Sequence, residues 1–477
     1  MQWLDTHFNC DSAVDSIIEG NKVELRQLDM LNQKGMRVAD QCIKFLELMG
    51  VKYVFGIPAA SNLPLYDAVY KTGIKTIIHK NEAGSGYSAS HYAGQCTNIG
   101  VCILGGTVGV NNAINAIGEA YVNKNPILII SGSPNRGRRD RGGIQNVDTV
   151  SITKPITKYS YLIQREDEVL AEIYKAVKIA STPPFGPVHV SIPVDVQNAT
   201  ISNFNIIKMD FECVLRFDDE ALKRAIEIIN LEDNGIIYVG RGVKKYAELV
   251  KRISTKLSWP VIATPCGKGI VEDEFEFYMG NYGIFSTEFT KKFLKEYKSS
   301  CLMLLGTSLN EISITDLNDS FMQDKKIIHI DYDIDELNKV FEVDNPVHYD
   351  LGLALPELLE KCNLKKFRKF NRGAFNKPCI NNKTQVSVRY FIENIFEYLP
   401  DKCNIVTDIG EFMSYVIKYL PIKKDVKFHL NAVYGAMGNA SGGAVGSHLA
   451  FQNHRTVVIT GDGGFFMNGM EILTAKE

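Results

Sequence analysis

The N-terminal part of the chain alternates between short apolar runs and longer amphipathic segments. The runs are rich in Val and Ile and are bounded by Gly or Pro, which is typical of buried strands. The segments between them carry apolar residues at spacings of three and four, which predicts helices. Strands are predicted at 51–56, 75–79, 100–106, 126–132 and 187–193, and helices at 38–48, 82–92, 112–121 and 168–179. This alternation predicts a parallel sheet with helices on both faces.

The same alternation occurs twice more along the chain. The second set has helices at 219–230 and 244–256, with strands at 235–240, 260–264, 301–306 and 326–331. The third set has helices at 386–399 and 411–419, a strand at 404–410, and an apolar run at 455–464 that leads into a final helix from Gly469. We therefore predict an α/β protein with three doubly wound parallel-sheet domains.

Domain bounds follow from the polar stretches between these sets. We predict an N-terminal extension at 1–35, a first domain at 36–200, a central domain at 212–360, a linker at 361–385 and a third domain at 386–477. The linker is basic and rich in Asn, which fits either an exposed connection or a small nucleic-acid patch.

Charge and cysteine usage narrow the class of function. The chain has 53 Lys and Arg against 55 Asp and Glu, a net charge of -2, so no long-range field attracts nucleic acid or an anionic membrane. The N-terminus lacks the pattern of a signal peptide, and no apolar run reaches the roughly 18 residues of a membrane helix. The 10 cysteines form no CxxC pair, which predicts reduced core thiols. We expect small-molecule chemistry in the cytoplasm, with no nucleic-acid or membrane partner.

Three local signals point to chemistry, and each also has a plain structural explanation. Asp462 lies between glycines directly after a predicted strand, where it suits either a divalent cation beside a phosphate or a simple turn. Glu82 begins a predicted helix, as a functional carboxylate or as a cap. The small-residue loop 105–112 allows close approach of a ligand or only tight packing. The chain contains no GxxxxGK[ST] motif and no complete GxGxxG motif, which argues against P-loop and nicotinamide-binding folds.

The order of these signals resembles the thiamine diphosphate-dependent enzymes. The first domain resembles their pyrimidine-binding domain in VFGIPAASNLPLYDAV (54–69), in the Glu82 segment and in GGTVGVNNAINAIGEAYVNKNPILIISG (105–132). The third domain resembles their diphosphate-binding domain in TDIGEFM (407–413), YGAMGNASGGAVGSHLA (434–450) and GDGGFFMNGMEILTA (461–475). The resemblance covers nearly all residues after about 36 and is weaker in the central domain.

The resemblance implies thiamine diphosphate and Mg2+ as cofactors. Glu82 is expected to activate the aminopyrimidine ring, Met437 to support the bent cofactor, and Asp462 to bind the Mg2+ that bridges the diphosphate. The backbone amides of Gly410 and Glu411 are expected to bind the diphosphate. The remaining expected cofactor-binding residues are Pro58, Gly109, Asn112, Gly435, Gly461, Gly463 and Gly464.

Within the family, the chain is most similar to the acetolactate synthase catalytic subunits. The similarity lies in GGIQNVDTVSITKPITKYSYLI (142–163) and ASTPPFGPVHVSIPVDVQ (180–197), where Gln145 matches a glutamine of the active site. The chain has no His-His pair, unlike the pyruvate and indolepyruvate decarboxylases. The resemblance implies a carboligase that decarboxylates pyruvate or another small 2-oxo acid and transfers the enamine to an acceptor carbonyl. A decarboxylase or lyase, or an inactive structural or regulatory relative, remains the alternative.

The sequence departs from the family in three places. The segment GTSLNEISITD (306–316) lacks the Arg of an FAD-binding central domain, so FAD is not expected. Four arginines at 136, 138, 139 and 141 either meet an anionic substrate or face solvent. The family's second metal ligand, an Asn roughly 25 to 30 residues after Asp462, has no counterpart before Glu477. We therefore expect a longer natural chain whose further segment supplies this ligand and a lid.

The family's architecture also predicts an oligomer. The pyrimidine domain of one subunit faces the diphosphate domain of another in such enzymes, so we expect a homodimer or homotetramer. In that arrangement Glu82 and Asp462 meet across the subunit interface.

Overall fold

The computed structural model describes residues 35–96, 98–139, 141–201, 217–314, 321–322, 324–370 and 386–477. The predicted extension at 1–35 lies outside this range except for Gly35, and so do residues 371–385 of the predicted linker. The chain divides into two compact units, one of Met1–Leu215 with Tyr434–Glu477 and one of Arg216–Val433. Among the described residues, no helix has both the length and the apolar character needed to cross a bilayer.

Six parallel strands form the sheet of the first unit, in the order β2–β1–β3–β4–β6–β5. They are β1 (Tyr53–Gly56), β2 (Lys75–Ile78), β3 (Gly100–Leu104), β4 (Ile127–Ser133), β5 (Tyr159–Leu162) and β6 (Val188–Pro193). The sequence predicts all of them except β5. The residues of this edge strand are all only half-buried, so it lacks the continuous apolar run that marks a buried parallel strand.

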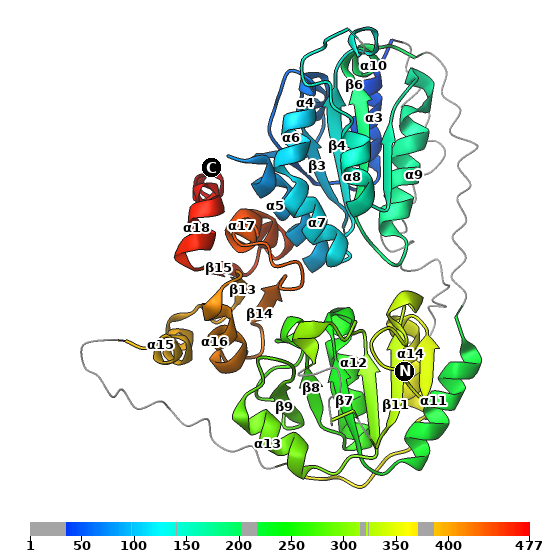
Figure 1. The fold of residues 1–477 in the computed structure, drawn as a ribbon, viewed down its shortest axis with the longest axis vertical. Coiled ribbons are helices and arrows are strands. Elements are labelled where there is room, and N and C mark those ends of the chain that lie inside the picture. The colour runs from blue at the N-terminus through cyan, green and yellow to red at the C-terminus, as the bar shows by residue number, and fades with distance from the viewer. Residues whose placement is uncertain are drawn as a thin grey trace. The chain divides into compact units, whose positions relative to one another are not determined.

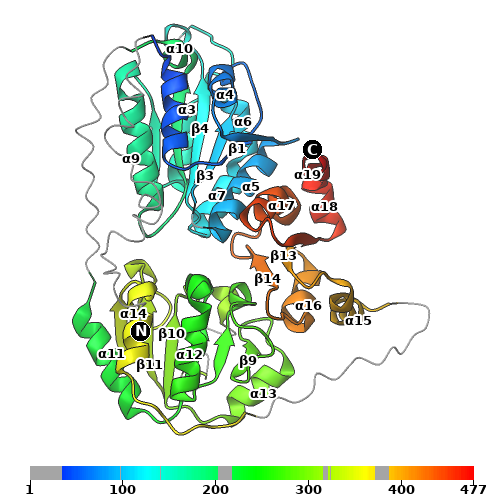
Figure 2. The same ribbon diagram turned by 180° about the vertical axis from the view of Figure 1, so that it is seen from behind.

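Helices cover both faces of this sheet, as predicted. Side chains alternate along each strand, so Val101 and Ile103 of β3 face one helix layer while Cys102 and Leu104 face the other. The first layer, seen in Figure 2, contains α3 (Val38–Leu48), α4 (Leu63–Tyr70), α9 (Val169–Ser181) and α10 (Val194–Asn198). The second, seen in Figure 1, contains α5 (Glu82–Gln95), α6 (Thr107–Asn112), α7 (Ile114–Val122) and α8 (Thr149–Thr153).

The second unit contains another sheet of six parallel strands, in the order β12–β11–β10–β7–β8–β9. These are β7 (Gly235–Val239), β8 (Val261–Ala263), β9 (Tyr278–Asn281), β10 (Cys301–Leu305), β11 (Lys326–Asp331) and β12 (Asn345–His348). Its helices are α11 (Asp219–Leu231), α12 (Ala247–Leu257), α13 (Glu288–Glu296) and α14 (Leu351–Lys361). The sequence misses the two outermost strands, β9 and β12, because both are short and neither carries a run of Val or Ile.

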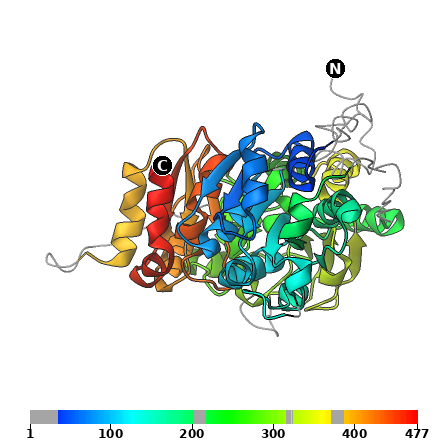
Figure 3. The same ribbon diagram turned by 90° about the horizontal axis from the view of Figure 1, so that it is seen from above.

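The third sheet has the order β14–β13–β15, with β13 (Cys403–Thr407) and β14 (Lys427–Leu430) in parallel register. The second unit also contains α15 (Val388–Ile395) and α16 (Glu411–Tyr419), and the first unit contains β15 (Arg455–Ile459), α17 (Asn439–Ala450), α18 (Asp462–Asn468) and α19 (Ile472–Lys476). The chain ends after α19 at the point marked C in Figure 3. The predicted three-domain α/β architecture is confirmed, and Cys102 and Cys301 are buried free thiols. The predicted domain bounds stay predictions.

Helices α5 and α17 lie in direct backbone contact within the first unit (Figure 1). A Cβ atom added at Gly446 would lie 1.9 Å from the carbonyl oxygen of Ser88. The Ser88 hydroxyl also donates to the carbonyl oxygen of Gly442, at 2.9 Å. Only glycine permits this spacing, because any side chain at 446 would push the two helices apart.

We predict that Gly446→Ala destabilises the first unit. The added methyl group must displace helix backbone, so the loss is expected to be at least about 2 kcal/mol. Thermal or urea unfolding measures it. His448→Ala is the matched control, because His448 is an exposed residue of the same helix, and its effect should stay within about 0.5 kcal/mol. Equal stability of the Gly446→Ala variant and the natural chain would contradict this packing.

Burial lowers the pKa of three histidines that lie in the sheets or directly after them. His79 follows β2, and its Nε2 lies 2.8 Å from the hydroxyl of Ser88. Burial lowers the pKa of His79, His189 and His329 to about 4 each. Because the unfolded chain takes up these protons near pH 6.5 and the folded chain does not, stability is complete above pH 6.5 and decreases as the pH falls toward 4.

We predict that His79→Asn weakens this pH dependence. Each histidine contributes up to about 1.4 kcal/mol per pH unit, so the variant should lose less stability than the natural chain between about pH 7 and about pH 5. Urea unfolding at several pH values measures the difference. His448→Asn, which changes an exposed histidine, should leave the slope unaltered. An unchanged slope for His79→Asn would show that His79 does not contribute.

Candidate functional site

Glu82 lies where strand β2 turns into helix α5. Asn81 caps this helix, since its Oδ1 accepts the backbone N–H of Ala83 at 2.8 Å. Glu82 is therefore the first helical residue and its carboxylate is half-buried. The cap role that a carboxylate could have had here belongs to Asn81, so the side chain of Glu82 is available for other contacts.

Helix α6 supplies the surroundings of the Glu82 carboxylate. Asn112 Nδ2 donates to Glu82 Oε2 at 3.0 Å. The other oxygen, Oε1, lies 3.4 Å from the position that a Cβ at Gly109 would take. The structure thus brings together three residues that the sequence selected separately. Tyr66 lies at the end of the buried strand β3, since its hydroxyl donates to the carbonyl oxygen of Ile103 at 3.0 Å, and burial raises the pKa of Tyr66.

Gln145 joins the same edge of the sheet. Its backbone is in the left-handed region, with φ of 57°, and its carbonyl oxygen accepts the hydroxyl of Thr107 at 2.6 Å. A Cβ at Gly106 would lie 3.0 Å from Gln145 Oε1. Gln145 therefore lies at the start of helix α6, the helix that ends at Asn112. Pro58, in the loop after β1, is exposed, and no contact ties it to Glu82.

The four arginines near Gln145 have different surroundings. Arg136 donates to Asp195 and to Glu166, and to the carbonyl oxygen of Gln164. Arg136 therefore has a structural role, because its hydrogen bonds connect the segments that carry Asp195, Gln164 and Glu166. Arg138 and Arg141 are exposed, as is expected if these arginines face solvent.

A second cluster of expected residues lies around the end of strand β15. Met437 Cε lies 2.8 Å from the position that a Cβ at Gly463 would take, so Met437 contacts the glycine-rich turn. Gly461 precedes helix α18 in extended conformation, and Asp462 Oδ1 accepts the N–H of Gly463 at 2.8 Å. Helix α18 begins at Asp462 itself, earlier than the predicted start at Gly469. Gly464 is buried in this helix, and Gly435 precedes Met437 with φ of 76°.

Gly410 and Glu411 belong to the second compact unit. Glu411 is the first residue of α16, directly after β13 and Gly410. The first N–H groups of a helix lack an acceptor one turn earlier, which suits them to bind an anion. In α16 the N–H of Met413 donates to the carbonyl oxygen of Gly410 at 3.0 Å, and Gly410 and Glu411 precede Met413 in the chain. These two residues therefore meet the local requirement of a phosphate-binding turn.

Few side chains of the candidate site could coordinate a metal ion. Within the described residues, no group of three or more His, Cys, Asp or Glu side chains is arranged to hold a metal ion. Asp462 is exposed and supplies one carboxylate. Mg2+ is commonly bound by one or two carboxylates together with substrate phosphates and water, so Asp462 fits Mg2+ only as a partial site that a bound diphosphate completes.

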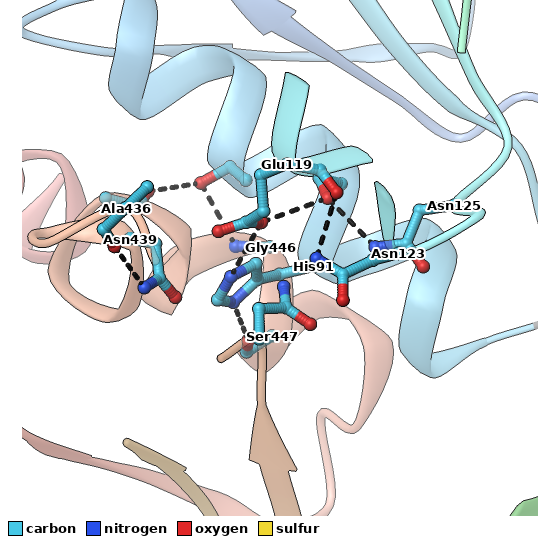
Figure 4. Close-up of polar contacts among 12 residues, drawn as sticks. His91, Glu119, Asn123, Asn125, Ala436, Asn439, Gly446 and Ser447 are labelled. Carbon is cyan, nitrogen blue, oxygen red and sulfur yellow. Dashed lines mark hydrogen bonds and ion pairs between the residues drawn. The ribbon is translucent and has the colours of Figure 1, made fainter. Parts of the chain in front are cut away.

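The sequence misses a buried polar network behind the site (Figure 4). His91 of α5 and Glu119 of α7 are both fully buried, and His91 Nε2 lies 3.6 Å from Glu119 Oε1. Ser90 also donates to Glu119, and His91 Nδ1 lies 3.2 Å from the hydroxyl of Ser447 in α17. The network links three helices, so it fixes α5 and α17 relative to each other.

The sequence also misses Glu471. This carboxylate is 2% exposed and accepts the backbone N–H groups of Lys80 and Asn81, directly before Glu82. The available signal was a lone acidic residue between Met470 and Ile472, in a segment otherwise apolar on both sides.

Three models described as thiamine pyrophosphate enzyme match the chain: the N-terminal TPP binding domain over residues 36–152, the central domain over 222–358 and the C-terminal TPP binding domain over 408–477. These are the regions that carry Glu82, the central sheet and Asp462, in that order.

Individual relatives extend over most of the chain. It is 28% identical to the acetolactate synthase large subunit of Lactococcus lactis subsp. lactis (strain IL1403), over 90% of this chain and 76% of the relative. It is 27% identical to the acetolactate synthase isozyme 1 large subunit of Escherichia coli (strain K12), over 92% and 79%. A probable acetolactate synthase large subunit of Methanocaldococcus jannaschii is 26% identical, over 93% and 78%.

The matched models are the three parts of one enzyme family, they occur in its order, and together they span more than half of the chain. With acetolactate synthase large subunits as relatives over nine tenths of its length, the chain belongs to the thiamine pyrophosphate enzyme family.

Proposed function

We propose that the protein is a carboligase, similar to acetolactate synthase, that uses thiamine diphosphate and Mg2+ to decarboxylate pyruvate or another small 2-oxo acid and to join the remaining fragment to an acceptor carbonyl. The observation that carries the proposal is the setting of Glu82. Its carboxylate begins a helix, is held on one oxygen by Asn112, and has its other oxygen beside Gly109. The acetolactate synthase relatives support the choice of reaction.

Thiamine diphosphate, when bound, supplies the nucleophilic carbon and the electron sink for loss of CO2 from a 2-oxo acid. The protein has to hold a proton beside the pyrimidine ring of this cofactor. Within the described part of the chain, the side chain of Glu82 accepts one hydrogen bond, from Asn112. Oε1 is left for a ring nitrogen, with which it can share a proton.

Other residues of the chain would bind and orient the cofactor, the Mg2+ ion and the substrate. Asp462 would bind Mg2+ with one carboxylate, and the N–H groups at the start of α16 would bind the diphosphate. Met437 would support the cofactor from the turn that it contacts at Gly463. Gln145 is proposed to face the 2-oxo acid, because its side chain lies at the start of α6, the helix that carries Asn112.

We predict that Glu82→Gln lowers turnover of pyruvate at least about a hundredfold, because an amide cannot take up or return the proton. Binding of thiamine diphosphate, measured by calorimetric titration, should stay close to that of the natural chain. Release of CO2 and formation of the ligated product are followed with pyruvate alone and with added aldehydes.

Glu288→Gln is the matched control for this variant. Glu288 is also the first residue of a helix, α13, and its side chain is 91% exposed. Near-normal turnover of Glu82→Gln would overturn the assignment of the cofactor. Release of CO2 without a ligated product would identify a decarboxylase, and absence of thiamine diphosphate binding would identify an inactive relative.

We further propose that the protein acts in the cytoplasm as a homodimer or homotetramer in which Glu82 of one subunit and Asp462 of another complete each site. The cofactor would then lie at a subunit interface. Within the single chain, residues 434–477 already contact α5, so the mixing experiment below decides between sites completed by two subunits and sites completed by one.

We predict that two inactive variants restore activity when they are mixed. A heterodimer of Glu82→Gln and Asp462→Ala chains contains one site with both residues intact, so about half of the natural activity per heterodimer is expected if the two sites work independently, or about a quarter for an equal mixture after full exchange. Activity is measured after subunit exchange, which is confirmed by native mass spectrometry. If exchange occurs without rescue, both residues act within one chain.

A further inference from the structure

Glu471 is a buried carboxylate that lies at the N-terminal end of helix α5. Its Oε1 accepts the backbone N–H of Lys80 at 3.1 Å and that of Asn81 at 3.0 Å. Its Oε2 accepts the hydroxyl of Thr474 at 2.7 Å. Both oxygens therefore have donors although the side chain is 2% exposed.

Both N–H groups belong to the loop between β2 and α5, and the Glu471 carboxylate is the acceptor that the structure gives them. Lys80 and Asn81 are exposed residues, so the carboxylate holds a loop that solvent can reach. A negative charge is also favoured beside the N-terminus of a helix. Burial raises the pKa of Glu471, whereas its bonds to Thr474, Lys80 and Asn81 oppose that rise.

The contact between Glu471 and the loop depends on the absence of a side chain at Gly84. A Cβ at Gly84, in the first turn of α5, would lie 2.4 Å from Glu471 Oε1. Glycine at 84 thus lets the carboxylate reach the loop. Thr474, one turn after Glu471, also donates weakly to the carbonyl oxygen of Ile78, at 3.4 Å. The end of β2 and the start of α5 are both tied to the same C-terminal segment.

These ties hold the backbone that carries Glu82. Residues 80 and 81 precede Glu82 directly, and Asn81 also caps α5 through Ala83. The backbone on the N-terminal side of Glu82 is fixed by Glu471, and its carboxylate is fixed by Asn112. The segment that supplies Glu471 begins at Asp462, nine residues earlier in the sequence.

We propose that Glu471 is a positioning residue for Glu82: by accepting the N–H groups of Lys80 and Asn81, it fixes the direction from which the Glu82 carboxylate meets the cofactor. This role rests on the proposed function of Glu82. It makes no use of contact between Glu471 and substrate, so its effects should disappear when Glu82 itself is disabled.

The experiment compares Glu471→Ala, Glu471→Gln and the control Glu477→Gln. Glu477 contacts the same Lys80, but through its side chain, and is 63% exposed. Hydrogen exchange is measured by mass spectrometry on peptides that contain residues 79–84. For Glu471→Ala, exchange of the amides of Lys80 and Asn81 should rise about tenfold or more. Glu471→Gln should recover most of the protection, since its carbonyl oxygen still accepts both N–H groups. Glu477→Gln should resemble the natural chain.

Turnover gives the second readout. Glu471→Ala should lower kcat about tenfold or more with little change in thiamine diphosphate affinity, and Glu471→Gln should recover most of this loss. In the double variant with Glu82→Gln, removal of Glu471 should cause no further loss, because it acts through Glu82. If Glu471→Ala does not fold, the same comparison of exchange and kcat is made with Glu471→Gln and Thr474→Val, where a partial rise in exchange and a partial loss of kcat are then expected.

Each outcome separates this role from the proposed function. Unchanged exchange in every Glu471 variant would overturn the contact. Raised exchange with full kcat, or an additional loss in the double variant, would overturn the positioning role while leaving the carboligase proposal intact. Absence of turnover and of thiamine diphosphate binding in the natural chain would overturn the proposed function, and this role with it, although the exchange measurement would still report the contact.

Discussion

The backbone of helix α17 lies directly on the backbone of helix α5, and the candidate site depends on that contact. Gly446 lies against the carbonyl oxygen of Ser88, at a distance that no side chain would allow. Because the two helices touch through glycines, polar groups of one reach the other within hydrogen-bonding distance. Ser88, His91 and Gln95 of α5 all have partners in α17. A register shift between these helices would break several buried bonds at once.

The effects of this contact extend along α5. Towards the middle of the helix, His91 and the fully buried Glu119 add a polar network in which α7 also takes part. At the N-terminal end, Glu471 accepts two N–H groups of the loop before Glu82. Glu82 is therefore the first residue of a helix whose position is fixed by contacts with α17, with α7 and with Glu471. Such rigidity suits the proposed role of Glu82, which is to share a proton with a ring nitrogen, because misplacement by about 1 Å can lower the rate about a hundredfold.

The site residues around Asp462 are positioned by the local geometry of the glycine-rich turn. Asp462 follows an extended Gly461 and begins α18, so its carboxylate emerges from the first turn of a helix. Met437 contacts the same turn at Gly463. These positions follow from the chain itself, since a glycine-rich turn after a parallel strand places its residues at the carboxyl edge of a sheet, where ligands of α/β proteins bind.

The sequence by itself determined the α/β class and most of the central strands, and it selected the residue types of the candidate site. Buried parallel strands such as β3 and β10 are continuous apolar runs, and this local pattern is visible without any partner. It missed β5, β9, β12 and β14 because these outermost strands are short and partly exposed. The pairing of Asn112 with Glu82, the network around Glu119 and the contact of Glu471 with residues 80 and 81 were decided only by the tertiary structure. Their partners lie about 30 to about 390 positions apart, and each bond depends on helix spacing set by glycine packing, which no local pattern encodes.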